Sequence, residues 1–233
     1  MKDSSCKGMN LLEKFLSSDS VSLKICGVTT ADDGAALIEH GVEALGVNFW
    51  PQSKRGTTPE QAAWLLPLAG KILRIGVFVN QPKEFAAGIF EKGMIDVVQL
   101  HGDESADEVT YFYERQIPLF RAIALRRAED VVLRGCESAH GILLDAYAPG
   151  VYGGTGERVD WGEAKKFREQ YPQIAMILAG GITPENAAQA ASHVRPCALD
   201  VASGAELRPG VKDFVKVAAL MKAVGSTHST HVD

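Results

Sequence analysis

Short apolar runs alternate with longer amphipathic stretches along most of the chain. The apolar runs are rich in Val, Ile, Leu and Ala, which is typical of strands buried on both faces. They recur at fairly even spacing, at Leu23–Cys26, Ala44–Asn48, Leu73–Phe78, Val97–Leu100, Leu119–Ala122, Ile142–Asp145, Ala175–Ala179 and Ala198–Val201. The pattern predicts eight strands.

The stretches between these runs carry apolar residues at the spacing of a helix face. They lie at Ala31–His40, Pro59–Leu68, Pro82–Lys92, Ser105–Arg115, Ala128–Cys136, Trp161–Gln170, Pro184–His193 and Val211–Lys222. Two of them begin with a threonine followed by proline, Thr58-Pro59 and Thr183-Pro184. A capping hydroxyl before a proline is a common helix start. We therefore expect a helix after every strand.

Strands that alternate with helices pair in parallel, and eight of them close a barrel. An open doubly wound sheet is the alternative, but it normally carries a glycine-rich fingerprint after its first strand. The segment Gly27-Val28-Thr29 is no such fingerprint. We therefore predict an α/β fold, a (β/α)8 TIM barrel in a single domain over residues 21–224. Residues 1–20 would form an N-terminal extension and residues 225–233 a C-terminal tail.

Composition and charge argue against nucleic-acid-binding, metal-binding, secreted and membrane proteins. The net charge is −5, which argues against a nucleic-acid surface, since such surfaces usually cluster Lys and Arg. The four cysteines, Cys6, Cys26, Cys136 and Cys197, form no CxxC pair and indicate neither a zinc site nor a disulfide framework. The polar first twenty residues lack the apolar core of a signal peptide, and no run is long enough to cross a bilayer. We expect a cytoplasmic protein without nucleic-acid or membrane partners.

The first predicted strand ends in Lys24-Ile25-Cys26-Gly27. Alternation places Lys24 and Cys26 on one face and Ile25 on the other, and Ile25 suits the helix layer. A lone cysteine is more often a small core residue than a reactive one. Here, however, it lies at the end of a strand where barrel enzymes carry their chemistry, beside a lysine whose charge favours the thiolate. We interpret Cys26 as a reactive residue.

The sixth predicted strand ends in Asp145. Aspartate in such a place usually caps a helix or a turn. The next predicted helix begins only at Trp161, beyond a glycine-rich loop, which argues against a cap. We expect a carboxyl group in the partly desolvated mouth of the barrel to have a raised pKa and to act as a general acid. Cys26 and Asp145 would open into one cavity.

Glycines follow the last three strands. Gly153-Gly154-Thr155-Gly156 lies after the sixth, Gly180-Gly181 after the seventh, and Ser203-Gly204 after the eighth, which contains Asp200. The loops after strands seven and eight hold phosphate in many barrels, where glycine lets the backbone N–H groups approach the anion. Ordinary turns before helices are the alternative for each loop alone. The matching pair favours a phosphate site.

Two further side chains lie at predicted strand ends. Arg55 ends Trp50-Pro51-Gln52-Ser53-Lys54-Arg55 after the second strand, and His101 follows the fourth. A solvated basic loop is the simpler interpretation of the first. At the mouth of an acidic barrel, however, Arg55 could present its fork to a carboxylate. A lone histidine is more often structural than catalytic, so His101 is a binding candidate only.

Together these segments closely resemble the phosphoribosylanthranilate isomerases of tryptophan biosynthesis. The shared motifs appear in family order and cover essentially the whole predicted barrel. They are Lys24-Ile25-Cys26-Gly27, Gly46-Val47-Asn48-Phe49-Trp50-Pro51 with Ser53-Lys54-Arg55, Gly76-Val77-Phe78-Val79-Asn80, Val98-Gln99-Leu100-His101-Gly102, Leu143-Leu144-Asp145, Gly153-Gly154-Thr155-Gly156 with Asp160-Trp161, Ala179-Gly180-Gly181, and Asp200-Val201-Ala202-Ser203-Gly204. The family's first motif usually lies close to the N-terminus, whereas here about twenty residues precede it.

The resemblance implies an isomerase that carries out an Amadori rearrangement without a metal or a cofactor. N-(5-phosphoribosyl)anthranilate would become 1-(2-carboxyphenylamino)-1-deoxyribulose 5-phosphate, in a monomer or a homodimer. Cys26 would be the general base and Asp145 the general acid, while Arg55, with His101 nearby, would hold the anthranilate carboxylate. The remaining substrate contacts are expected from the phosphate loops, at Gly154, Gly180, Gly181, Asp200, Ser203 and Gly204.

Other functions remain as alternatives. The related phosphoribosyl-amine isomerase of histidine biosynthesis would be expected to carry aspartates at the ends of strands one and five. Here strand one ends in Cys26 and strand five reads Leu119-Phe120-Arg121-Ala122. Another barrel enzyme of the tryptophan pathway would lack the cysteine motif. A non-catalytic phosphate-ligand-binding barrel would have no chemical need for both Cys26 and Asp145.

Overall fold

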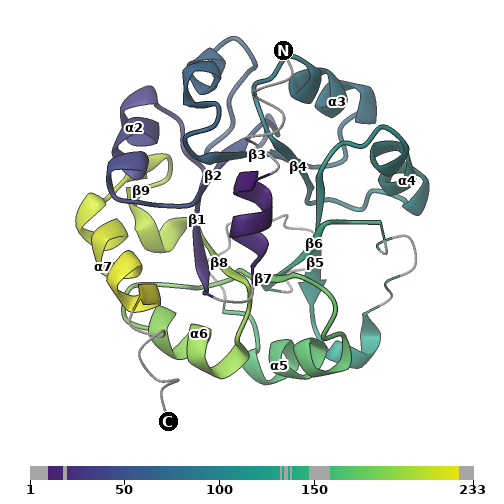
Figure 1. The fold of residues 1–233 in the computed structure, drawn as a ribbon, viewed down its shortest axis with the longest axis vertical. Helices are drawn as coiled ribbons and strands as arrows, with labels where there is room; N and C mark the ends of the chain where they lie inside the picture. The colour runs from purple at the N-terminus through teal and green to yellow at the C-terminus, as the bar shows by residue number, and fades with distance from the viewer. Residues whose placement is uncertain are drawn as a thin grey trace.

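A computed structural model describes residues 10–17, 20–131, 133, 136, 138–146 and 158–225 of the 233-residue chain. Eight parallel strands close a barrel in chain order (Figure 1). They are β1 Ser22–Cys26, β2 Ala44–Asn48, β3 Leu73–Phe78, β4 Val97–Leu100, β5 Leu119–Leu125, β6 Gly141–Ala146, β7 Met176–Leu178 and β8 Ala198–Val201. Closure is completed by pairing of β1 with β8, Lys24 opposite Asp200. The predicted barrel and its eight strands are confirmed.

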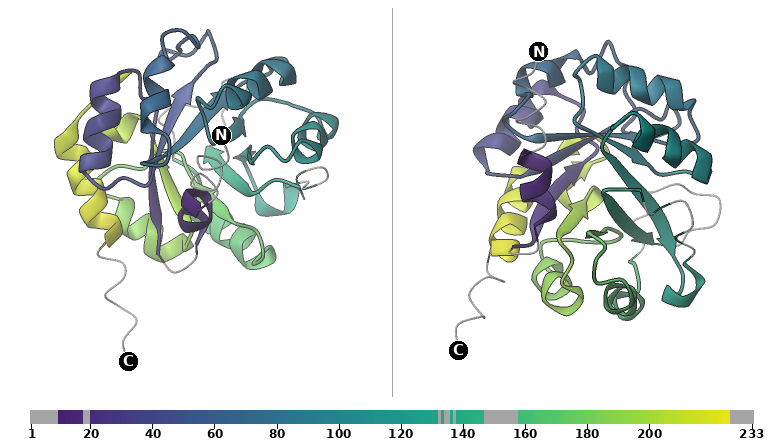
Figure 2. Two further views of the ribbon diagram at one scale, coloured as in Figure 1. Left: turned by 45° about the horizontal axis from the view of Figure 1, so that its top comes forward. Right: turned by 45° about the vertical axis from the view of Figure 1, so that its right-hand side comes forward.

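The helices surround the strands (Figure 2). They are α2 Ala31–Glu39, α3 Lys83–Glu91, α4 Ala106–Glu114, α5 Trp161–Gln170, α6 Ala187–Val194 and α7 Phe214–Gly225. Local capping fixes several starts: Ser105 and Glu108 form a capping box at α4, and the Asp160 carboxylate accepts from the N–H groups of Gly162 and Glu163 at α5. Within the described residues, no helix has the length and apolar character that a membrane span needs.

Two predicted helices are wrong in type. Pro59–Leu68 is a series of turns followed by the 3-10 helix η1 Ala63–Leu68. Pro67 inside it has no N–H for a helical hydrogen bond, and the Leu65 carbonyl instead accepts from the Arg74 guanidinium. The described part of Ala128–Cys136 begins as the short 3-10 helix η2 Ala128–Asp130 and is already extended at Val131. A β-branched residue there disfavours the helix.

Two other predicted helices begin later than expected. The segment Val211–Lys222 starts as a strand, β10 Val211–Lys212, which pairs with β9 Glu206–Arg208 before α7 begins. After β7, the chain first makes a turn in which the Asn186 side chain accepts from the Thr183 N–H and donates to the Gly181 carbonyl. Asn186 rather than Thr183 is therefore the residue that precedes α6.

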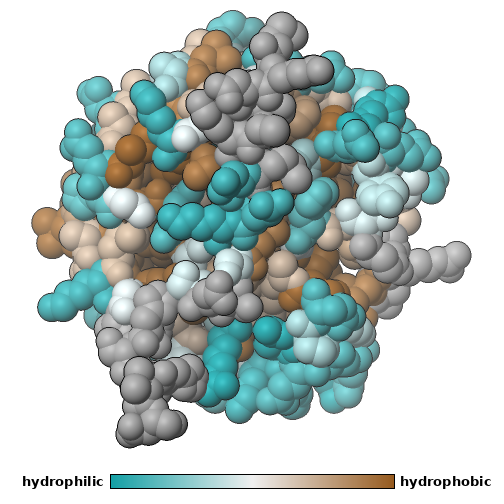
Figure 3. Space-filling model, in the orientation of Figure 1, coloured by the Kyte–Doolittle hydropathy of each residue, from teal (hydrophilic) through white to brown (hydrophobic). Residues whose placement is uncertain are grey.

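Residues 10–16 form a helix that lies over the N-terminal end of the barrel (Figure 1). Its Leu12 and Phe15 are buried in one cluster with Ala44, Leu73, Val97 and other residues that begin the strands. The ring of Phe15 stacks on that of Phe120 with centroids 6.0 Å apart. Figure 3 shows hydrophilic side chains across the middle of the face where this helix lies. Part of the N-terminal extension thus completes the inner core.

Replacing Phe15 with alanine is expected to lower the free energy of unfolding by about 3–5 kcal/mol, the usual cost of removing a buried aromatic ring. Urea unfolding followed by circular dichroism measures the change. Glu13→Ala is the matched control, because Glu13 lies on the exposed side of the same helix and its loss should change stability by less than about 0.5 kcal/mol. Equal stability of the Phe15 variant and wild type would contradict the packing role.

The interior of the barrel changes from apolar to polar along the strands. At the N-terminal ends the inward side chains are apolar. Nearer the C-terminal ends Lys24, Gln99 and Asp200 are buried side by side on β1, β4 and β8. Buried polar groups are costly unless they are paired, so these residues must satisfy one another. They form the floor of the candidate site.

Candidate active site

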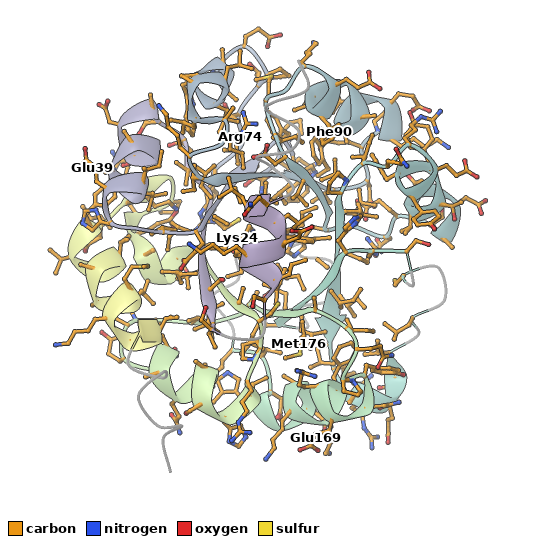
Figure 4. All side chains as sticks on the ribbon, in the orientation of Figure 1. Lys24, Glu39, Arg74, Phe90, Glu169 and Met176 are labelled. Carbon is orange, nitrogen blue, oxygen red and sulfur yellow. The ribbon has the colours of Figure 1, made fainter. Side chains whose placement is uncertain are left out.

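Lys24 lies at the centre of the polar layer. Its side chain is fully buried and extends from β1 into the ring of strands (Figure 4). The Nζ atom donates to Asp200 Oδ1 and to Gln99 Oε1, both at 3.0 Å. Burial opposes the charge, but the attraction of Asp200 and of Cys26 outweighs it, and the pKa of Lys24 is raised. Lys24 is therefore a buried ammonium.

Cys26 lies directly above this layer, opposite Gly46 of β2. A methyl group on Gly46 would come within 2.8 Å of Cys26 Sγ and 3.1 Å of Lys24 Nζ, so only glycine leaves room for both side chains. We expected Lys24 to favour the thiolate. Lys24 does lower the pKa of Cys26, but burial has the larger effect and the pKa is raised. The resting residue is therefore a thiol, because desolvation outweighs the charge of Lys24.

Asp145 and His101 lie together at the mouth, with side chains 17% and 15% exposed. His101 Nε2 is 3.2 Å from Asp145 Oδ2, and the Ala146 N–H donates to Asp145 Oδ1. The expectation of a raised pKa for Asp145 is wrong. Burial raises it, but the hydrogen bond from His101, the Ala146 N–H and the charge of Lys24 together lower the pKa below its usual value. The resting carboxyl group is ionised.

Arg55 crosses the loop after β1 and pairs with Glu206 of β9. The Arg55 Nε atom donates to Glu206 Oε1 at 2.9 Å and Nη2 to Oε2 at 2.7 Å, a bidentate pair. Lys212 Nζ donates to the same Oε1 at 2.7 Å and to the Cys26 carbonyl at 2.6 Å. The hydrogen bonds that Arg55 donates to Glu206 raise the pKa of Arg55. Arg55 is therefore held beside the end of β1 as a cation.

The loops after β7 and β8 pack against each other. Gly180 and Gly181 have φ of 80° and 65°. Ser203 begins the short 3-10 helix η3 Ser203–Ala205, and a methyl group on Gly204 would come within 2.0 Å of the Ile182 carbonyl oxygen. Only glycine permits that approach. These residues lie at the predicted phosphate site, whereas Gly154 lies outside the described residues.

Sequence reasoning missed four residues of this site: Gln99, Gly46, Glu206 and Lys212. Gln99 had a usable signal, because it is two residues from His101 on the same strand face. Gly46 had one as well, since glycine inside a strand often marks a close approach. Glu206 and Lys212 had none, because Glu206 is 151 residues away from its partner Arg55. Asp200, expected to contact substrate, accepts a hydrogen bond from Lys24 in the layer beneath Cys26.

One hydrogen-bonded network leads from Lys24, beside Cys26, to Asp145. It runs from Asp200 through Lys24, Gln99 and His101 to Asp145, and Cys26 Sγ and Lys24 Nζ lie together beside Gly46. All strands of the barrel are parallel, so a thiol on β1 and a carboxyl group on β6 meet at one mouth. Such a pair can move protons to and from two atoms of one bound molecule.

Comparison with known proteins gives a consistent result. The sequence profile of the family "N-(5'phosphoribosyl)anthranilate (PRA) isomerase" matches residues 23–223. The N-(5'-phosphoribosyl)anthranilate isomerase of Nitrosococcus oceani is 42% identical over 211 residues, 88% of this chain and 98% of that protein. The crystal structure of phosphoribosyl anthranilate isomerase from Thermus thermophilus is 35% identical with a TM-score of 0.77, over 88% of this chain and 99% of that one.

A second solved structure is a phosphoribosyl anthranilate isomerase in complex with reduced 1-(o-carboxyphenylamino)-1-deoxyribulose 5-phosphate. It is 31% identical, with a TM-score of 0.73, over 88% of this chain and 99% of that one. The profile and the relatives all cover the barrel that carries Cys26 and Asp145. The chain therefore belongs to the N-(5'-phosphoribosyl)anthranilate isomerase family.

Proposed function

We propose that this protein catalyses the Amadori rearrangement of N-(5-phosphoribosyl)anthranilate to 1-(2-carboxyphenylamino)-1-deoxyribulose 5-phosphate. The observation that supports the proposal most directly is the network that leads from Lys24, beside Cys26, to Asp145 at the mouth of the barrel. The reaction needs one proton delivered to an oxygen and another removed from a carbon of the same sugar. It requires neither electron transfer nor a second substrate.

Asp145 is the general acid of the first step. In its protonated form it gives its proton to the furanose ring oxygen as the bond from C1 to that oxygen breaks. The nitrogen lone pair forms the C1=N double bond of a Schiff base. The hydrogen bonds of Asp145 to His101 and to Ala146 fix the carboxyl group in position for this transfer.

Cys26 is the general base of the second step. The Cys26 thiolate removes the proton from C2, the C2–H electrons form the C1–C2 double bond, and the C=N electrons return to nitrogen. The resulting enolamine takes up a proton at C1 and loses the proton of its C2 hydroxyl group, which becomes the ketone oxygen. The charge of Lys24, which lowers the pKa of Cys26, stabilises the thiolate when it forms. Formation of the Cys26 thiolate must therefore overcome the desolvation free energy that favours the thiol.

The two anionic ends of the substrate have matching partners. In the described part of the chain, Arg55 Nε and Nη2 bind Glu206, while Nη1 has no hydrogen-bond partner and can take the anthranilate carboxylate. His101 lies nearby at the mouth. At the other end, the backbone of Gly180, Gly181, Ser203 and Gly204 would bind the phosphate. We infer that the enzyme works in the cytoplasm, as a monomer or a homodimer.

Purified protein incubated with phosphoribosylanthranilate tests this function. Turnover to the deoxyribulose product is expected, together with growth of a tryptophan auxotroph that lacks its own isomerase. A chain that binds the compound without turnover would favour the phosphate-ligand-binding alternative. Turnover of the phosphoribosyl amine of histidine biosynthesis instead would favour the related isomerase.

Replacing Arg55 with alanine is expected to raise KM by about 10- to 100-fold with a smaller change in kcat, because a hydrogen bond to a charged group contributes about 1.5–3 kcal/mol. Arg55→Lys keeps the charge but loses the fork and should fall in between. Steady-state kinetics measure both. Lys54→Ala is the matched control, since Lys54 is the exposed neighbour in the same loop. An unchanged KM in the alanine variant would remove Arg55 from the carboxylate role.

A further inference from the structure

We propose that Gln99 is a positioning residue that holds His101 as a neutral imidazole with its proton on Nε2, and that Lys24 sets the orientation of Gln99. Gln99 is completely buried between Lys24 and His101. The tautomer follows from hydrogen-bond geometry alone. Only its consequence for catalysis rests on the proposed function.

The argument begins with the groups that can only donate. The Lys24 ammonium has three N–H donors and no acceptor. Its Nζ lies 3.0 Å from the oxygen Oε1 of Gln99, so the amide oxygen must face Lys24. The amide nitrogen Nε2 then faces His101 Nδ1 at 2.9 Å. Because an amide NH₂ only donates, Nδ1 must be the acceptor and carries no proton.

The proton of the neutral ring is therefore on Nε2, which lies 3.2 Å from Asp145 Oδ2 and donates to it. A doubly protonated ring would set Nδ1–H against the Gln99 NH₂, two donors facing each other. Rotating the amide to relieve that contact would set its NH₂ against the Lys24 ammonium. The Lys24 ammonium forms an ion pair with Asp200, and this pairing keeps Lys24 charged inside the barrel. Both ways of protonating His101 thus leave buried donors unpaired.

The charged groups around His101 come from several strands. Asp145 on β6 faces it directly, and its carboxylate alone would favour the imidazolium. Lys24 on β1 opposes the imidazolium through Gln99, while Asp200 on β8 is already paired with Lys24. Arg121 on β5 is bonded to Glu104. The Asp145 carboxylate and the Gln99 amide both select Nε2 as the protonated nitrogen, and among the described residues Gln99 is the group that opposes a second proton on Nδ1.

This arrangement favours the protonated form of Asp145, which the proposed reaction needs. An imidazolium at position 101 would hold Asp145 as a carboxylate by adding a full positive charge to the hydrogen bond already present. A neutral ring donates the same hydrogen bond without that charge. Gln99 thereby keeps the protonated form of Asp145 accessible for transfer to the substrate. A glutamate at this position would accept from both Lys24 and His101 and would reverse the effect.

Nitrogen-15 NMR of the histidine rings tests the proposal without any turnover. In wild type at pH 7, His101 should show a protonated Nε2 and an unprotonated Nδ1, with its signals assigned by their loss in His101→Gln. In Gln99→Glu the ratio of imidazolium to imidazole should rise at least about tenfold at the same pH, as expected for a new adjacent carboxylate. In Gln99→Met, which has no donor facing Nδ1, the Asp145 carboxylate still holds the proton on Nε2, but a second proton on Nδ1 is no longer opposed, so the ratio of imidazolium to imidazole should rise.

Activity gives the second readout. Gln99→Glu should lower kcat/KM at pH 7 by about tenfold or more and move the acidic limb of its pH profile to lower pH, because Asp145 is held ionised. Gln189→Glu, an exposed position on α6, is the charge-matched control and should match wild type. A proton on Nδ1, an imidazolium in wild type at pH 7, or identical ring spectra in wild type and the Gln99 variants would overturn the proposal. If the protein does not turn over phosphoribosylanthranilate, the ring spectra still decide the tautomer.

Discussion

Replacing Cys26 with alanine is expected to lower kcat by about 10²–10⁴-fold, the usual contribution of a general base. The variant should bind substrate nearly as well as wild type, because Arg55 and the phosphate loops are untouched. Single-turnover kinetics with phosphoribosylanthranilate measure the chemical step directly. Cys26→Ser should be nearly as slow, since a hydroxyl group is a far weaker source of a basic anion than a thiol.

A second cysteine supplies the control for this variant. Cys197 is buried, and burial raises its pKa to about 12. Its thiol donates to the Met176 carbonyl at the opposite end of the barrel, so Cys197→Ala should keep wild-type kcat. Full activity of Cys26→Ala would remove Cys26 from the mechanism. An equal loss in both alanine variants would point to packing rather than chemistry.

Replacing Asp145 with asparagine is expected to lower kcat by about 10²–10⁴-fold as well, because an amide has no proton to give to the ring oxygen. Asparagine still offers its side-chain oxygen to His101, so the fold and the hydrogen bond are kept. Asp160→Asn is the matched control: Asp160 caps α5 through its side-chain oxygen, and asparagine caps helices equally well. A fully active Asp145 variant would exclude it as the acid.

The pH dependence follows from the directions of the two pKa shifts. The pKa of Asp145 is lowered and that of Cys26 is raised, yet catalysis needs the protonated carboxyl group and the thiolate. Between the two pKa values the thiolate fraction rises with pH as fast as the carboxylic acid fraction falls, so kcat/KM should be flat. Below the pKa of Asp145 the rate falls because thiolate is lost, and above the pKa of Cys26 it falls because the acid is lost.

The alternation of side chains was enough to predict the barrel and the faces of its strands. Lys24 and Cys26 point inward because they are two residues apart on a strand whose other face is apolar. Helix type and boundaries were harder to predict, because periodicity alone did not distinguish the 3-10 helix η1 from an α-helix. In η1, Pro67 lacks an N–H group and the Leu65 carbonyl accepts a hydrogen bond from Arg74, and both features disfavour an α-helix. The local apolar spacing favours an α-helix there, whereas the tertiary hydrogen bond favours the 3-10 helix that is observed.

Charge states could not be predicted because they depend on neighbours that are distant in sequence. The sequence placed Lys24 beside Cys26 but did not reveal that the thiol is buried deeply enough to raise its pKa. It placed Asp145 at a mouth but did not reveal that His101, 44 residues away, holds the carboxylate. The Arg55 guanidinium was predicted to bind a substrate carboxylate. In the structure its Nε and Nη2 atoms already donate hydrogen bonds to Glu206.

The helix over the N-terminal end of the barrel behaves in energetic terms as a tethered ligand. It lies before residue 23, where the family match begins, so it is bound to the shared barrel rather than part of it. A short connection, residues 17–21, keeps it at an effective concentration of about millimolar or more, and its binding free energy adds to that of the barrel. Substitutions at Leu12 and Phe15, at the N-terminal end of the barrel, can therefore change the free energy of unfolding. They leave the geometry for proton transfer at the C-terminal end unchanged.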